Sequence, residues 1–217
     1  MGHWTREDIK PGTSDMRTLM IALAMLVATG STLAQKNIRQ VNFKSFTYPL
    51  NGHLLGHDRL QWLTRDAHPR KEPIHLLNGS DLTKVSSFVM DGNEYAQWEG
   101  FTLQSVGFAE LTGDGKEEAI VVLRYDTGGT QNTHYVYVYS FAAGKPNLLA
   151  YCYTGARAFS GLYRVYGEHG LLVFELFDQT KRSGDCCSSG IVRTRYRWQG
   201  KRFERVGTPE LLTLGKQ

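Results

Sequence analysis

The sequence predicts a mainly β protein, built as an antiparallel meander that forms a sandwich or a strongly bent sheet. From Thr133 to Ser140 the tyrosines and the valines fall on opposite faces, a period of two that no helix produces. After Trp98, apolar runs of about six to ten residues alternate with glycine-containing turns. The 23 glycines, the six prolines and the 12% aromatic content also favour strands and tight turns over disorder.

Residues 35–95 predict a short mixed α/β N-terminal arm that packs on the β domain. Residues 35–50 indicate an extended segment. Residues 51–95 are ambiguous, with a short helix capped by Asp58 and a second short element over 82–89 as candidates. The aromatic anchors available to the extended segment are Phe43, Phe46 and Tyr48.

Residues 96–207 form the predicted antiparallel β domain. The segments 119–123 and 171–177 are apolar on both faces, as central strands covered on each side are. Residues 191–198 alternate cleanly, and Gln199 with Gly200 turns the chain into a last strand, 201–206. Residues 208–217 are expected to be a C-terminal tail. One domain is the expectation for a chain of this length.

The first 34 residues predict a secretory signal peptide. Met16 and Arg17 begin it, 19–28 is an apolar run, and small residues lead to cleavage after Ala34. The mixed charge of 1–15 indicates that translation starts at Met16. The apolar run is short for a bilayer, so a retained membrane anchor is the secondary interpretation. We therefore expect a secreted or periplasmic protein.

The charge and the cysteines narrow the class of protein further. A net charge of +4 is too mild to indicate a nucleic-acid binder. Because exported proteins enter an oxidising compartment, we expect a disulfide bond. The favoured pairing joins Cys152 to Cys186 or Cys187. A bond between the adjacent Cys186 and Cys187, or three reduced thiols, are the alternatives. Adjacent cysteines lack the spacing that lets both thiolates face one zinc ion.

The arginine row on 191–198 is the first candidate binding site. Arg193, Arg195 and Arg197 share one strand face, with Lys201 and Arg205 nearby, and could bind phosphate or carboxylate groups of an anionic cell-envelope polymer. The competing interpretation is a sheet face or edge whose basic side chains maintain solubility and prevent edge pairing.

The acidic turn between two strand patterns is the second candidate. Glu110, Thr112, Asp114 and Glu118 resemble the calcium-binding turn of the secreted FG-GAP or VCBS repeats, in which alternating side-chain oxygens and a backbone carbonyl are the ligands. The resemblance covers about nine residues, and Glu110 and Thr112 replace the first two ligands of that pattern. The alternative is a tight hairpin whose acids face water.

Three further patterns are weaker candidates for a catalytic or binding site. Asp126-Thr127-Gly128 resembles the Asp-Thr-Gly of aspartic peptidases, although a hairpin loop explains it more simply. His53 and His57 have a metal-binding spacing for a helix, but glycines precede both. Core or sheet-cover positions are a simpler explanation for the tryptophans than a sugar-stacking platform: Trp62, Trp98 and Trp198.

The layout of 98–206, with its Gly-Asp-Gly turn, aromatic strand and late Cys-Cys, resembles uncharacterised secreted bacterial proteins, some of them lipoproteins of unknown function. Gln35 stands where the lipoproteins have their lipid-bearing cysteine, so we expect no lipid anchor. The resemblance implies no known activity. We expect a non-catalytic envelope or extracellular binding or structural module, without a cofactor apart from calcium. The alternative is a hydrolase of envelope polymers that uses Asp114, Glu118 and Asp126 as acid and base.

Overall fold

A computed structural model describes residues 37–50, 73–129, 132–156, 160–183 and 187–214. The predicted signal peptide and the helix expected near Asp58 lie outside these ranges. By its contacts, Lys36–Gln217 is one compact unit. Among the described residues, no helix is both long and apolar enough to cross a bilayer.

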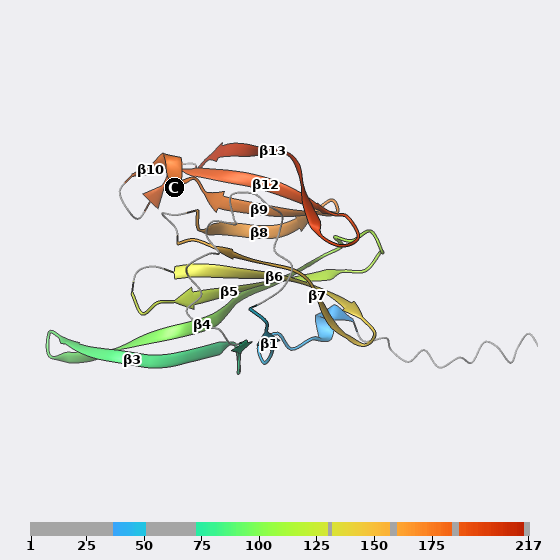
Figure 1. Ribbon diagram of the computed structural model, residues 1–217. Coiled ribbons are helices and arrows are strands. Elements are labelled where there is room, and N and C mark those ends of the chain that lie inside the picture. Colours follow the sequence, from blue (N-terminus) through green and yellow to red (C-terminus); the bar gives the residue numbers. More distant parts are fainter. Residues whose placement is uncertain (1–36, 51–72, 130–131, 157–159, 184–186, 215–217) are drawn as a thin grey trace, which may run out of the picture. The chain divides into compact units, whose positions relative to one another are not determined.

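The chain forms two main antiparallel sheets (Figure 1), which confirms the predicted fold class. The first sheet has five strands in sequence order, so each pairs with the strand that follows it. These strands are β3 (Ser80–Met90), β4 (Asn93–Ala109), β5 (Glu118–Asp126), β6 (Asn132–Ala142) and β7 (Lys145–Thr154).

The second main sheet has the order β13-β12-β9-β8. Its strands are β8 (Leu162–Glu168), β9 (Leu171–Phe177), β12 (Gly190–Trp198) and β13 (Phe203–Thr213). A short 3-10 helix and a small hairpin connect β9 to β12: η3 (Gln179–Lys181), β10 (Arg182–Ser183) and β11 (Cys187–Ser188).

The two main sheets pack face to face around a mixed apolar core, which we call the inner cluster. Ile120 and Val136 of the first sheet share this cluster with Leu172 and Phe174 of the second. The sheets approach closely near Gly167 of β8, where an added Cβ would lie 2.1 Å from the Cβ of Ala109. A larger residue at 167 would therefore push the sheets apart.

The opposite face of the five-stranded sheet carries a layer of tyrosines, which we call the outer cluster. The predicted alternation in β6 is confirmed, because Tyr135 and Tyr137 belong to this cluster whereas Val136 and Val138 belong to the inner one. Residues 119–123 of β5 are all buried, as a strand covered on both faces requires.

The N-terminal segment covers the outer cluster, as expected for an arm that packs on the β domain. Phe43 and Tyr48 pack against Tyr139, and Tyr48 donates a hydrogen bond to the carbonyl of Phe43. Among the residues that the structure places here, the only helix is 3-10 and the strands are two residues long: η1 (Ile38–Gln40), β1 (Thr47–Tyr48) and β2 (Ile74–His75).

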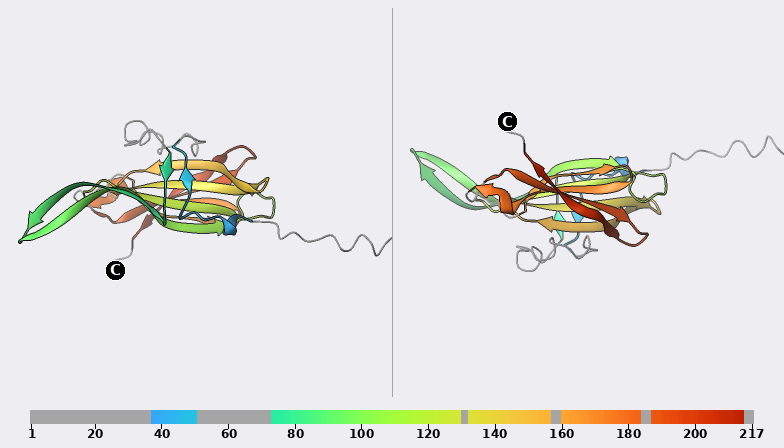
Figure 2. Two further views of the ribbon diagram at one scale, coloured as in Figure 1. Left: turned by 90° about the horizontal axis from the view of Figure 1, so that it is seen from below. Right: turned by 90° about the horizontal axis from the view of Figure 1, so that it is seen from above.

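Two predicted boundaries are wrong. The first sheet starts at Ser80 rather than at residue 96, because 80–90 pair with 93–102 as a long hairpin around Asp91 and Gly92. The green ribbon in Figure 2 is this hairpin. At the other end β13 continues to Thr213, through residues expected to be a tail. The bulge that Gly207 and Pro209 form within β13 hides this continuation from a sequence pattern.

Candidate functional site

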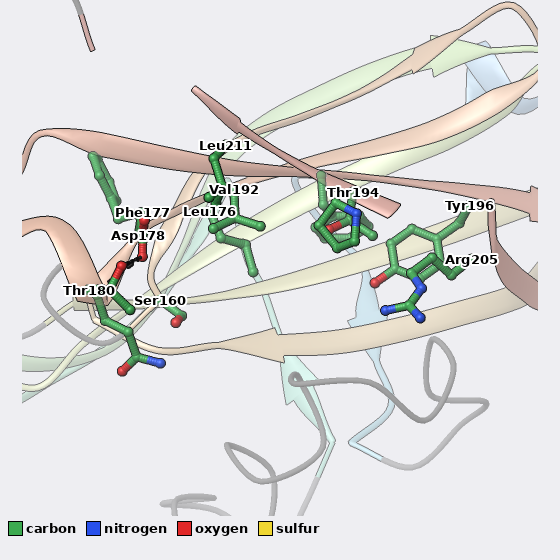
Figure 3. Close-up of a pocket in the computed structure, with 13 residues that line it drawn as sticks. Ser160, Leu176, Phe177, Asp178, Thr180, Val192, Thr194, Tyr196, Arg205 and Leu211 are labelled. Atoms are coloured by element: carbon green, nitrogen blue, oxygen red, sulfur yellow. Dashed lines mark hydrogen bonds between the residues drawn. The ribbon is translucent and has the colours of Figure 1, made fainter. Parts of the chain in front are cut away.

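A pocket of about 460 Å³ lies on the inner face of the four-stranded sheet (Figure 3). Alternate residues of β9 and β12 form its floor, and β13 and the segment after β9 form its sides. This volume is within the range of about 300–1,000 Å³ that is usual for small-molecule sites. The lining residues are Ser160, Phe174, Leu176, Phe177, Asp178, Gln179, Thr180, Val192, Thr194, Tyr196, Arg205, Pro209 and Leu211.

A bulge in β13 shapes one side of the pocket. Arg193 pairs with Glu210 and Arg195 pairs with Val206, so residues 207–209 lie opposite the single residue Thr194. Gly207 adopts a positive φ of 70°, and Pro209 has no N–H to donate to a ladder. The bulge therefore interrupts the strand pairing beside Thr194, and bulges of this kind are common next to binding sites.

Polar groups lie at the two ends of this pocket. At one end Arg205 is the register partner of Tyr196, and Figure 3 shows its guanidinium beside the tyrosine hydroxyl. At the other end the Oδ1 of buried Asp178 accepts hydrogen bonds from the backbone N–H and the hydroxyl of Thr180, at 2.9 and 2.7 Å. Asp178 thus begins η3. The Arg205 end carries a guanidinium and a hydroxyl group.

The pocket's chemistry is that of a binding site for a partly apolar molecule. Leu176, Val192 and Leu211 form one row across three strands, because Val192 is the register partner of both other residues. Their side chains offer an apolar surface, while Arg205 and Tyr196 offer N–H and O–H donors at the end of that surface. Such a site accommodates an apolar body with an acceptor or an anionic group at one end.

The predicted arginine row lies on the opposite face of this sheet and is largely ion-paired. Arg193 donates to Glu175 at 2.7 Å and to Glu210 at 3.4 Å, and Arg195 pairs with the same Glu210. Arg164 of β8 also pairs with Glu175. Alternating charges in register across four strands explain this arrangement, and the sequence pattern of a single strand does not reveal the acidic partners.

Glu175 is the centre of the ion-paired network. Its side chain is 1% exposed and accepts hydrogen bonds from both arginines and, at 3.3 Å, from Tyr166. Burial raises the pKa of Glu175, but the hydrogen bonds from Arg164 and Arg193 outweigh it, so the pKa lies below its usual value. Arg197 is exposed and forms no ion pair within the described part of the chain.

In the acidic turn, the carboxylates accept hydrogen bonds from the turn itself. Buried Glu118 accepts from the Leu111 N–H at 2.8 Å and from the Thr112 hydroxyl at 3.2 Å. Asp114 accepts from the Lys116 N–H at 2.9 Å, and Glu110 accepts from the N–H of Gly113. Burial raises the pKa of Glu118.

These contacts stabilise a hairpin turn. Across the placed residues, no group of three or more His, Cys, Asp and Glu side chains is arranged to hold a metal. Of the three carboxylates expected to act as acid and base, Asp114 and Glu118 both lie in the turn, whereas Asp126 is remote: Glu118 and Asp126 stand at opposite ends of β5, about 26 Å apart at about 3.3 Å per residue. Asp126 instead pairs with Arg124 at 2.9 Å.

Cys152 is free and buried in the inner cluster, so the predicted disulfide from Cys152 is absent from the structure. Its place in β7 puts the thiol on the same face as Ala150, where it packs as a small apolar side chain. Burial raises the pKa of this thiol. Cys186 and the side chain of Cys187 lie outside the described residues, so a bond between these two stays a prediction.

Trp98 and Trp198 do not form a platform on the described surface. Trp98 is 48% exposed on β4, while Trp198 packs against the inner cluster and Phe203. Trp62, like His53 and His57, lies outside the described residues. Trp98 and Trp198 therefore take unrelated positions in different sheets.

The pocket was not predicted from the sequence, although the alternation of 191–198 places three of its residues on one face. The alternation of β12 separates Val192, Thr194 and Tyr196 from the arginines, which is a signal that the structure confirms. It did not predict that Arg205 joins this apolar face. Comparison with protein-family models, curated proteins and solved structures gave no match.

Proposed function

We propose that the protein is a secreted, non-catalytic binding module whose ligand occupies the pocket of the four-stranded sheet. The ligand class is a molecule from the envelope or the extracellular medium, with an apolar body and a carboxylate or similar acceptor at one end. The observation that carries this proposal is the combination of the Leu176, Val192 and Leu211 row with Arg205 at its end.

Two further observations support binding over catalysis. The carboxylate of Asp178, the one acid among the lining residues, accepts both donors of Thr180 and so has a structural role. Asp126 lies far along β5 from the acids of the turn, whereas paired acid and base groups need about 5–10 Å. The turn acids Glu118 and Asp114 accept hydrogen bonds from the turn itself, which is a structural role. The ion pairs of Arg193 and Arg195 also make the arginine row a weaker ligand site than the pocket.

The export half of the proposal comes from the N-terminal sequence. The basic start at Arg17, the apolar run of 19–28 and the small residues before Gln35 are the features of a cleaved signal peptide. N-terminal sequencing of the protein from its native host tests this half. A mature protein that begins at Gln35 is the expected result, and an intact N-terminus in the cytoplasm contradicts it.

Calorimetric titration with decanoate and decanol tests the pocket. The wild-type protein is expected to bind decanoate more tightly than decanol, because Arg205 and Tyr196 face the head group. Arg205→Gln is expected to weaken decanoate binding about tenfold and to leave decanol binding unchanged, since only the anion gains from the guanidinium. Thr194→Trp, which fills the pocket, is expected to abolish both.

Arg197→Gln is the matched control, because it removes the same charge from the opposite face of the sheet. It is expected to leave both affinities unchanged. Equal losses from Arg205→Gln and Arg197→Gln would show that decanoate responds only to net charge. Absence of binding by both probes at about 1 mM, which corresponds to about −4 kcal/mol, contradicts this ligand class.

A further inference from the structure

The outer part of the β3–β4 hairpin is a ribbon that pairs with no further strand of the described residues. We define the ribbon as residues 82–99, since β4 pairs with β5 only from Gly100 onward. Over these residues β3 and β4 pair with each other alone, and a two-stranded hairpin by itself is marginally stable in water. Large apolar side chains are nevertheless exposed along it: Leu82, Val85, Phe88, Val89, Met90, Tyr95 and Trp98.

Beyond Lys84 and the bulge that follows it, the outer edge of the ribbon lacks protection against strand pairing. β3 is an edge strand, and its segment 85–90 contains neither a charged residue nor a proline. Natural edge strands usually carry such residues to prevent pairing with another chain. Phe88 and Tyr95 stack across the ribbon, with ring centroids 5.6 Å apart, so an aromatic surface extends to this edge.

We propose that β3 pairs antiparallel with β3 of a second copy of the chain, which joins two five-stranded sheets into one. A two-fold axis near Phe88 brings the two uncharged segments side by side, and the closed symmetry limits the assembly to a dimer. This pairing satisfies the free backbone groups of both edges and brings apolar side chains of the two β3 strands into cross-strand contact.

The charges of the ribbon favour this partner and this direction. In the antiparallel arrangement the tip of one ribbon lies beside the base of the other, so Lys84 of each copy, which pairs with Glu94 of its own copy at 3.6 Å, also approaches Asp91 of the second copy. A parallel arrangement would instead place Lys84 beside Lys84. The ribbon carries one lysine against three acids, Asp91, Glu94 and Glu99, which disfavours an anionic membrane as its partner.

The area of the interface indicates a reversible dimer. For the five large apolar residues of β3 the exposed fractions range from 38% for Leu82 to 72% for Val89, so their complete coverage would bury roughly 500 Å² per copy. The total of about 1,000 Å² is near the lower limit for a specific interface. We therefore expect association at micromolar rather than nanomolar concentration.

Light scattering coupled to gel filtration, from about 1 to about 200 µM, tests the dimer. The wild-type mass is expected to rise from one copy to two, and Val89→Lys is expected to weaken dimerisation at least tenfold. Leu211→Lys is the matched control, because Leu211 is 71% exposed on another edge strand. Circular dichroism checks that each variant is folded.

A wild-type protein that stays monomeric, a mass above two copies, or equal effects of Val89→Lys and Leu211→Lys would each overturn the proposal. Charge reversal tests the direction of pairing. Lys84→Glu is expected to weaken dimerisation, and the addition of Asp91→Lys is expected to restore it. A double variant that remains as weak as Lys84→Glu would overturn the antiparallel arrangement.

Discussion

Replacing Glu175 by glutamine is expected to destabilise the four-stranded sheet strongly. The side chain is 1% exposed and accepts hydrogen bonds from Arg164 and Arg193. Glutamine keeps the size but loses the charge, and its amide group presents donors to two donors. A hydrogen bond to a charged group contributes about 1.5–3 kcal/mol.

Because Arg164 is 54% exposed and therefore screened, most of the loss comes from Arg193, which is 22% exposed. We expect the free energy of unfolding to fall by about 2–3 kcal/mol. In urea, with a slope of about 2 kcal/mol per M, the midpoint shifts down by about 1 M. Glu210→Gln is the control, and its effect should be much smaller because Glu210 is 45% exposed.

The pH dependence of the Glu175→Gln effect provides a second check. The folded pKa of Glu175 lies below the unfolded value of about 4.3, so its stabilisation is complete above that pH. As the pH falls through the folded pKa, the carboxylate is protonated and the difference between wild type and variant shrinks. A difference under about 0.5 kcal/mol at neutral pH, or one that grows in acid, would refute this account of the network.

Three other changes test the packing. Tyr137→Phe is expected to stabilise the fold by about 1 kcal/mol, because the buried Tyr137 hydroxyl has no hydrogen-bond partner among the described residues. Tyr48→Phe is expected to destabilise it, because the hydrogen bond to the Phe43 carbonyl is lost. Shifts of the melting temperature in the same direction for both variants would contradict this. Gly167→Ala is expected to lower the free energy of unfolding, measured in urea, by about 1–3 kcal/mol. Adding Ala109→Gly is expected to restore part of this loss. If it restores none, the contact with Ala109 is not the cause of the loss. Burial lowers the pKa of His134 to about 4. As the pH is lowered from about 6.5 to about 4, the unfolded state takes up a proton that the folded state does not, so the free energy of unfolding decreases. His134→Gln should flatten this pH dependence.

The fold class was predictable because the strands of this protein alternate strictly. Tyr135, Val136 and Tyr137 face the layers that the pattern assigned to them, and the apolar run of 119–123 is buried on both faces. The hairpin around Asp91 was not predictable in this way. Its apolar side chains lie on both faces and remain exposed, so the usual contrast between a core face and a solvent face is missing.

The candidate site was harder to predict because it depends on pairing between distant strands. Arg193 and Arg195 read as a basic row along the chain, but Glu175 and Glu210 neutralise them across the sheet. Likewise Arg205 joins the pocket because of its register with Tyr196, which no local pattern specifies. Period and composition predict faces, whereas a site requires the register between strands.

The cover over the tyrosine layer has a consequence for the order of folding. Most strands of the two main sheets pair with the next strand in the chain, so their loops are short and close quickly. Phe43 and Tyr48, by contrast, meet Tyr139 across a large sequence separation. The N-terminal segment is synthesised before the sheet, but it can dock only after the sheet has formed. Until it docks, the new sheet exposes a row of aromatic rings.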